Sequence, residues 1–158
     1  MKAAEMGRSR WGGRNWPGTV GLIEDRASTV RILTAVCHLG PAGTRVRRAF
    51  DAIGGLQAVE SLLDTAPVPD LIVVDGPTCG EMAADVLLAL AAGRDQGRTA
   101  VMLLTGSGSP PAPELLAMAD LWGVKVGEIE AVPDVIRLLH AASRAGASPG
   151  RVGADRAA

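Results

Sequence analysis

The chain has 158 residues, of which 47% are hydrophobic and 21% are charged, and its formal net charge is −1. This length is typical of one domain that buries its core without disulfide or metal crosslinks. Residues 1–18 and 144–158 have an excess of basic side chains, so the part between them is acidic. Because nucleic-acid-binding surfaces gather basic charge, this composition argues against nucleic acid as a partner of the folded part.

Two cysteines and the lack of a long apolar segment narrow the class further. Cys37 and Cys79 are far apart and form no C-x-x-C motif, which argues against a disulfide framework or a zinc site. The longest purely apolar run, 86–92, is much shorter than the roughly 20 residues that cross a bilayer. The N-terminus also lacks the apolar segment of a secretion signal. We therefore expect a cytoplasmic protein with no membrane partner.

The first half of the chain predicts two strands and two helices. Residues 19–24 form the first strand, and the apolar positions of 28–39 fall on one face of a helix. Residues 45–52 alternate basic and apolar side chains, as in an edge strand whose charges deter pairing with other chains. The pair of glycines that follows ends this strand, and a helical stripe covers 56–63.

The second half begins with residues 70–75 (DLIVVD), an apolar run between two acids that is expected of a central strand buried on both faces. The elements expected after it are, in order, a helix at 81–92, a strand at 99–105, a helix at 114–122, a strand at 124–129 and a helix that begins at Pro133. Strands that alternate with helices predict an α/β fold with a parallel sheet. Trp122 is either an exposed docking anchor or a core residue. We interpret 1–18 and 146–158 as flexible tails around a domain at 19–145.

Acidic residues end two of the predicted strands, with Glu24 and Asp25 after the first and Asp75 after the third. Ligands of open parallel sheets bind at the carboxyl ends of the strands. If the strand order is 2-1-3-4-5, these two strands are neighbours and the three carboxylates converge. They repel one another unless one is protonated or a cation lies between them, and hard oxygen ligands suit Mg²⁺. Alternatively, Glu24 and Asp25 are loop and capping residues of the following helix.

Four segments, in this order and spacing, resemble the receiver domains of bacterial response regulators over residues 19–143. They are IEDR at 23–26, GLQAVESLL at 55–63, PDLIVVD at 69–75 and VMLLTG at 101–106. The resemblance implies a chemotaxis-receiver-like, flavodoxin-like fold of three layers, with a doubly wound, five-stranded parallel sheet of strand order 2-1-3-4-5. It also implies a phosphoprotein of a bacterial two-component system.

The same resemblance assigns roles to five residues. Asp75 would be the phosphoacceptor, which receives a phosphoryl group from a histidine kinase or a phosphotransfer protein. Glu24, Asp25 and Asp75 would hold Mg²⁺ together with the backbone carbonyl of Pro77, and the metal would neutralise charge on the transferred group. Thr105 would be the switch hydroxyl that follows the phosphoryl group. A downstream protein would dock on the surface of the fourth predicted helix, the fifth strand and the fifth helix.

Residues after about 145 are too few for a DNA-binding output domain, so we expect a stand-alone receiver that takes part in a phosphorelay and signals by protein contact. No enzyme activity is expected beyond self-catalysed phosphoryl transfer to Asp75. One alternative is a pseudo-receiver, an interaction domain that works without phosphorylation. Another is a Toprim-like metal-dependent enzyme, which we rank last because that family has D-x-D where this chain has Asp75-Gly76-Pro77.

The sequence departs from the receiver pattern at two places. Receivers carry a lysine near the end of the fifth strand, where this chain has Ile129 or Glu130, depending on the alignment. Lys125 is about 13 Å from that end, whereas Arg26 directly follows the acidic pair and is either a substitute cation or a solvated loop residue. The family commonly has a proline at the position of Cys79, which is either an oxidation-sensitive exposed thiol or a small loop residue. The missing lysine makes the receiver atypical and favours the pseudo-receiver alternative.

Overall fold

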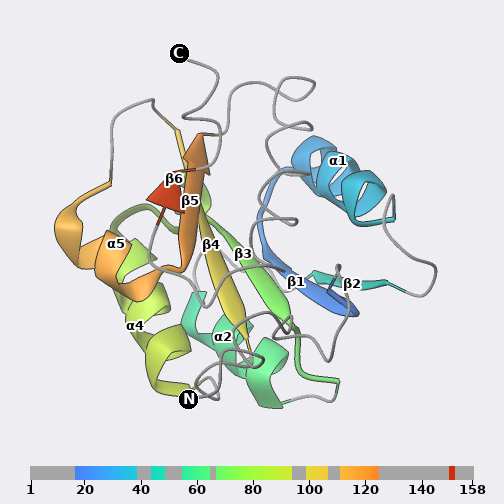
Figure 1. Ribbon diagram of the computed structural model, residues 1–158, viewed down its shortest axis with the longest axis horizontal. Coiled ribbons are helices and arrows are strands. Elements are labelled where there is room, and N and C mark those ends of the chain that lie inside the picture. The colour runs from blue at the N-terminus through green and yellow to red at the C-terminus, as the bar shows by residue number, and fades with distance from the viewer. Residues whose placement is uncertain are drawn as a thin grey trace, which may run out of the picture.

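The computed structural model describes residues 17–38, 44–48, 55–64, 67–93, 99–106, 111–124 and 150–151. These residues form a parallel sheet in the order β2-β1-β3-β4-β5-β6, with helices on both of its faces (Figure 1). The strands are β1 (Thr19–Ile23), β2 (Arg45–Arg48), β3 (Leu71–Asp75), β4 (Ala100–Thr105), β5 (Leu121–Val124) and β6 (Gly150–Arg151). The predicted α/β fold and the doubly wound order 2-1-3-4-5 are confirmed, and the two-residue β6 is added beside β5.

The helices are divided between the two faces of the sheet. They are α1 (Ala27–Cys37), α2 (Gly55–Asp64), α3 (Gly76–Cys79), the 3-10 helix η1 (Gly80–Met82), α4 (Ala83–Gly93) and α5 (Pro113–Met118). In Figure 1, α1 lies on one face, and α2, α4 and α5 lie on the other. Neighbouring parallel strands need crossover connections, and here the crossovers supply the two outer layers.

Alternate residues of the central strands fill two separate cores. Leu71 and Val73 of β3 pack with Leu33 of α1 on one face of the sheet. The intervening Ile72 and Val74 belong to the core that includes α2 and α4 on the other face. Successive side chains of a strand point to opposite faces, so a strand between two helical layers needs an unbroken apolar run. This explains the DLIVVD segment, all of whose strand residues are buried.

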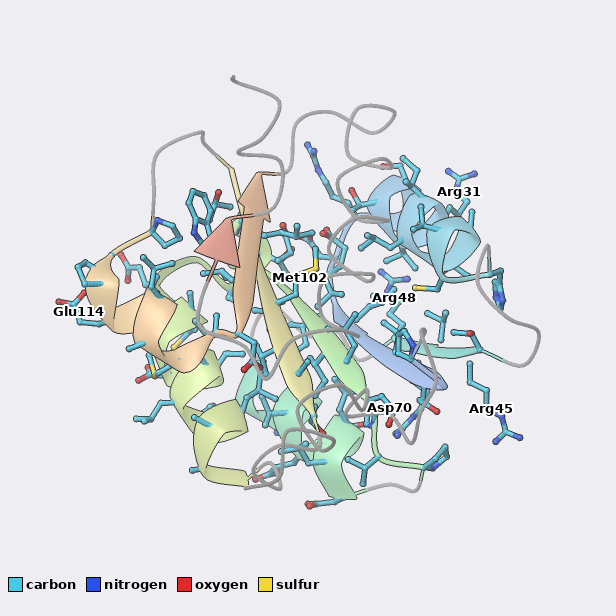
Figure 2. All side chains as sticks on the ribbon, in the orientation of Figure 1. Arg31, Arg45, Arg48, Asp70, Met102 and Glu114 are labelled. Carbon is cyan, nitrogen blue, oxygen red and sulfur yellow. The ribbon has the colours of Figure 1, made fainter. Side chains whose placement is uncertain are left out.

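Two aspartates tie the amino ends of the strands together. Asp70 Oδ2 accepts hydrogen bonds from the backbone N–H groups of Gly18 at 2.8 Å and Thr19 at 3.3 Å. Asp120 Oδ2 accepts a hydrogen bond from Val101 N at 2.8 Å. Figure 2 shows Asp70 near the amino end of β3. The acid that precedes β3 therefore satisfies backbone donors at the edge of the sheet opposite to the predicted site.

The fifth strand begins earlier than predicted. β5 spans Leu121–Val124, whereas the sequence predicted a strand at 124–129, and α5 ends at Met118 rather than at Trp122. A short apolar run fits the helical and the strand period equally well, which is why the boundary was misplaced. Trp122 pairs in register with Leu103 of β4 and is 6% exposed. Trp122 is therefore a core residue, which confirms the second of the two alternatives considered for it and excludes the first, an exposed docking anchor.

Several predicted segments lie outside the described residues. They are 1–16, 49–52, 125–149 and 152–158, which include Lys125, Ile129, Glu130 and the helix expected from Pro133. Within the segment expected to be the C-terminal tail, Gly150–Arg151 pair with β5. Gly55, which was expected to end the second strand, begins α2 instead. In the part of the chain that the structure describes, no helix has the length and hydropathy of a membrane span.

Helix α4 offers a matched test of this packing, because Leu87 is fully buried and its neighbour Leu88 is 60% exposed. We expect Leu87→Ala to lower the free energy of unfolding by about 2 to 5 kcal/mol, because it leaves a cavity in the core. Leu88→Ala, the same change in the same helix, should alter it by less than about 0.5 kcal/mol. Urea denaturation followed by circular dichroism measures both values. Equal losses of stability in the two variants would contradict the orientation of α4.

Candidate metal centre

Three carboxylates meet where β1 and β3 end. Asp75 is the last residue of β3, and Glu24 and Asp25 directly follow β1. In the parallel register Ile23 lies opposite Val74, so the residues that follow them come side by side. One ligand oxygen from each carboxylate lies within 4.8 Å of the other two. The structure thus brings together the three carboxylates that the sequence predicted to converge.

Burial makes this proximity costly. Glu24 and Asp75 are each 1% exposed, whereas Asp25 is exposed. Like charges that water screens poorly repel strongly. Asp75 is engaged through Oδ2, but among the described residues none donates a hydrogen bond to its buried Oδ1. A set of hard carboxylate oxygens, two of them from buried side chains, fits a small divalent cation such as Mg²⁺.

Thr78, whose position was not predicted from the sequence, lies at the centre of the cluster. Its Oγ1 is 2.8 Å from Asp25 Oδ1 and 3.4 Å from Glu24 Oε1. The same hydroxyl is also hydrogen-bonded to Asp75 Oδ2. The signal for it in the sequence is an aspartate followed by glycine and proline, which is typical of a helix N-terminus and places Thr78 in the first turn.

Asp75 caps the short helix α3. Thr78 N donates to Asp75 Oδ2 at 3.0 Å, the bond that an N-cap side chain usually accepts. Gly76 lets this helix lie directly against β4, because a Cβ at that position would be 2.9 Å from the backbone oxygen of Leu104. The chain after Asp75 is therefore a helical turn held at both its carboxylate cap and its contact with β4, and not an open loop.

Pro77 lies in the first turn of α3. Its backbone carbonyl was predicted to be a metal ligand, and this role stays a prediction. The ring of Pro77 lies next to Gly106, where a Cβ would be 3.2 Å from Pro77 Cγ.

Arg48 brings positive charge to the acidic segment. It ends β2, the neighbour of β1, and its guanidinium donates to the backbone oxygens of Glu24 at 3.4 Å and Asp25 at 3.0 Å. In Figure 2, Arg48 lies close to β1. Arg26, which the sequence offered as a substitute cation for a phosphoryl group on Asp75, contacts Glu24 through its backbone N–H, which donates to Glu24 Oε1 at 2.9 Å. A basic residue on the adjacent edge strand could not be recognised without the strand register.

Thr105 ends β4 and is half-buried. The residue before it, Leu104, pairs in register with Asp75. Thr105 therefore lies one residue beyond the acid on the adjacent strand, at the same carboxyl edge of the sheet. Its role as the switch hydroxyl stays a prediction. The positions at which a lysine was sought, Ile129 and Glu130, lie outside the described residues.

Cys79 is the last residue of α3 and is buried, with 8% of its surface exposed. Burial and, to a smaller extent, the nearby carboxylates raise the pKa of its thiol to about 11. Burial likewise raises the pKa of Cys37 to about 12. Thiolates, not thiols, react with oxidants and alkylating reagents. The possibility of an exposed, oxidation-sensitive thiol at Cys79 is therefore wrong for this structure.

Comparison with known proteins bears on the fold. No protein-family model matches the chain, and no curated protein matches it. The chain is similar to a response regulator in red light signaling of R. palustris, at 22% identity and a TM-score of 0.59, over 77% of this chain and 91% of that one. It is also similar to a LuxR family DNA-binding response regulator from Silicibacter pomeroyi, at 20% identity and a TM-score of 0.54, over 87% and 98% of the two chains.

A third similar structure is the pilus assembly protein CpaE from Caulobacter crescentus, at 19% identity and a TM-score of 0.53, over 80% of this chain and 97% of that one. All three alignments span most of the other chain as well as most of this one. Similarity at these identities establishes a receiver-like fold. What the site does has to be argued from its own residues.

Alkylation by iodoacetamide tests the burial of the two thiols. At pH 8 a thiol with a pKa of about 11 is about 0.1% ionised, so we expect both cysteines of the native protein to react at least about 100-fold more slowly than in urea. Peptide mapping by mass spectrometry reports Cys37 and Cys79 separately. Fast labelling of Cys79 alone would show that α3 opens readily or that this residue faces solvent.

Proposed function

We propose that the chain is a receiver-like signalling domain in which Asp75 accepts a phosphoryl group in the presence of Mg²⁺. The observation that supports this most is the convergence of Glu24, Asp25 and Asp75 within 4.8 Å at the ends of two adjacent strands. A cation between the three carboxylates would relieve their repulsion, and one of them, Asp75, is in position to act as a nucleophile. The fold shared with response regulators is consistent with this role.

In this proposal Glu24, Asp25 and Asp75 hold Mg²⁺, which would neutralise charge on the oxygens of the transferred phosphoryl group. Thr78 N holds Asp75 Oδ2 at 3.0 Å, so Oδ1 is the oxygen that we expect to form the bond to phosphorus. As this bond forms, the N–P bond of a donor phosphohistidine breaks, and the imidazole keeps the electron pair and is left to take up a proton. The hydroxyl of Thr105, on the adjacent strand, would then contact the phosphoryl group.

The donor would be a histidine kinase or a phosphotransfer protein, and the signal would pass by contact with a downstream protein. We propose the surface of α5, β5 and the helix expected from Pro133 for that contact. Glu114 of α5 is exposed and lies at the outer edge of the molecule (Figure 2). We further propose that the domain acts alone in the cytoplasm and has no enzyme activity beyond its own phosphorylation.

One observation favours a second candidate, a pseudo-receiver that binds partners without phosphorylation. Asp75 is 1% exposed, and its Oδ2 accepts hydrogen bonds from both the backbone N–H and the hydroxyl of Thr78. A phosphodonor has to reach this buried carboxylate. In addition, the sequence provides no lysine at Ile129 or Glu130 to contact a phosphoryl group.

Incubation with Mg²⁺ and acetyl phosphate, followed by intact-mass spectrometry, tests the proposal. We expect one added phosphoryl group, which depends on Mg²⁺ and is absent in Asp75→Asn. The asparagine can still cap α3 through its side-chain oxygen, so the loss of the adduct reports the missing nucleophile and not a lost helix. The absence of any adduct at saturating donor, with Mg²⁺ still bound, would favour the pseudo-receiver.

A matched pair of variants separates the metal site from general charge effects. Asp25→Asn removes an exposed carboxylate of the cluster, and Asp85→Asn removes an exposed carboxylate of α4. We expect the first to raise the Mg²⁺ concentration needed for half-maximal phosphorylation by about tenfold or more, because a ligand is lost. The second should leave it unchanged. Equal behaviour of the two variants would contradict a cation site between β1 and β3.

A further inference from the structure

Charged side chains are unevenly distributed over the surface of the molecule. Exposed arginines lie on α1 and on the edge strand β2, among them Arg31 and Arg45. The helices α2, η1, α4 and α5 contain no lysine or arginine, and their exposed acids are Glu60, Asp64, Glu81, Asp85 and Glu114. Figure 2 shows Arg31 and Arg45 at one side of the molecule and Glu114 at the other. Arg47 of β2 reaches the end of α2, where backbone oxygens hold its guanidinium, including that of Ser61 at 2.9 Å.

Apolar side chains are exposed on the same helices. In the described part of the chain, the large hydrophobic residues that are exposed are Leu56 of α2, Met82 of η1 and Leu88 of α4, at 42%, 36% and 60%. Single exposed leucines are common, but these three residues all fall on helices that lack cations. Because α4 contacts both α2 and α5, these helices form one continuous surface, which we call the α4 face. Its chemistry suits a segment that is both basic and apolar.

The segment that precedes β1 has this composition. Residues 1–16 (MKAAEMGRSRWGGRNW) contain four basic side chains against one acid, a net charge of +3. Trp11 lies between Arg10 and Arg14 in the sequence, and Trp16 follows. Arginine and tryptophan are among the residues that contribute most to binding at protein interfaces. The segment therefore complements the α4 face in charge and in apolar character.

We propose that residues 1–16 dock on the α4 face of the same molecule, where Trp11 covers Leu88 and the neighbouring arginines lie near Asp85. Asp85 and Leu88 are three residues apart in α4, so they are neighbours on the helix surface. The exposed arginines of α1 and β2 repel a segment of charge +3, which leaves the α4 face as the favourable surface. Neither the metal centre nor phosphorylation enters this contact.

The start of β1 places the segment within reach of the α4 face. Pro17 lies at the amino edge of the sheet, where its carbonyl accepts a hydrogen bond from Thr44 Oγ1 at 3.2 Å. Helix α4 ends at this edge too, because it connects the carboxyl end of β3 to the amino end of β4. The six residues from Trp11 to Pro17 span up to about 20 Å, and Leu88 is about 8 Å from the end of α4. A tethered segment has an effective concentration of about 1 mM, so contacts that are weak between separate molecules become populated.

Quenching of tryptophan fluorescence by acrylamide tests the docking in the full-length chain. Trp122 is 6% exposed, so changes in quenching report Trp11 and Trp16. We expect Asp85→Lys, which reverses an exposed charge of the α4 face, to raise the quenching constant at least about twofold, as should about 0.5 M NaCl in the parent, because salt screens exposed charges. Arg31→Glu is the matched control, since it reverses an exposed charge of α1 and should leave the quenching constant unchanged.

Circular dichroism checks that each variant is folded, and Glu81→Lys replaces Asp85→Lys if that variant does not fold. Protection of the tryptophans that is independent of protein concentration and is lost in Asp85→Lys supports docking within the molecule. Equal quenching in the parent and in Asp85→Lys would overturn it. So would a quenchable component as accessible as the tryptophans of the urea-denatured chain, which leaves the α4 face to a basic partner protein. Protection that disappears on dilution would assign the face to a second copy of the chain and would also overturn the proposal.

Discussion

The repulsion among Glu24, Asp25 and Asp75 is the constraint that the contacts at the carboxyl edge of the sheet have to offset. Parallel pairing of β1 with β3 brings Glu24 and Asp75 together, and both are buried, so water screens their charges poorly. The surrounding chain offsets part of this cost. Arg26 N and Thr78 N donate to the two buried carboxylates, and the guanidinium of Arg48 binds the backbone on which two of the acids lie. These contacts hold the acidic residues in place at the carboxyl edge of the sheet.

The apolar layers matter to this site because they fix the positions of its donors. β3 and β4 are buried on both faces, and the register between them places Leu104 next to Asp75. Helix α3 then lies between the Asp75 carboxylate that caps it and the Leu104 oxygen that Gly76 approaches. A side chain at position 76 would push α3 away from β4 and carry Thr78 out of the cluster. The lack of a side chain at Gly76 therefore helps to define the acidic cluster.

The features that were predicted from the sequence depend on hydrophobic periodicity and on the residues at strand ends. The contacts that were missed depend on which residues of distant segments lie side by side. The run between Asp70 and Asp75 predicted a central strand because burial on two faces leaves no polar position, and the acids at the strand ends predicted the cluster. Thr78 and Arg48 escaped notice because their contacts join β1 to residues 53 or 54 and 23 or 24 positions away in the sequence. Trp122 was assigned to a helix end because four residues of β5 are too few to show a period.

Asp70 and Asp75, the acids on either side of the β3 core, show why the acidic cluster lies at only one edge of the sheet. At the amino edge, parallel strands present N–H groups, and Asp70 is satisfied by two of them, from Gly18 and Thr19. At the carboxyl edge, strands present C=O groups, which add to the negative charge of Asp75 instead of offsetting it. The backbone donors for the buried acids come from the starts of α1 and α3, with their positive helix ends. In this sheet, the aspartate before β3 therefore accepts backbone hydrogen bonds at the edge of the sheet itself, whereas the acids after β1 and β3 accept theirs from the N-termini of the following helices.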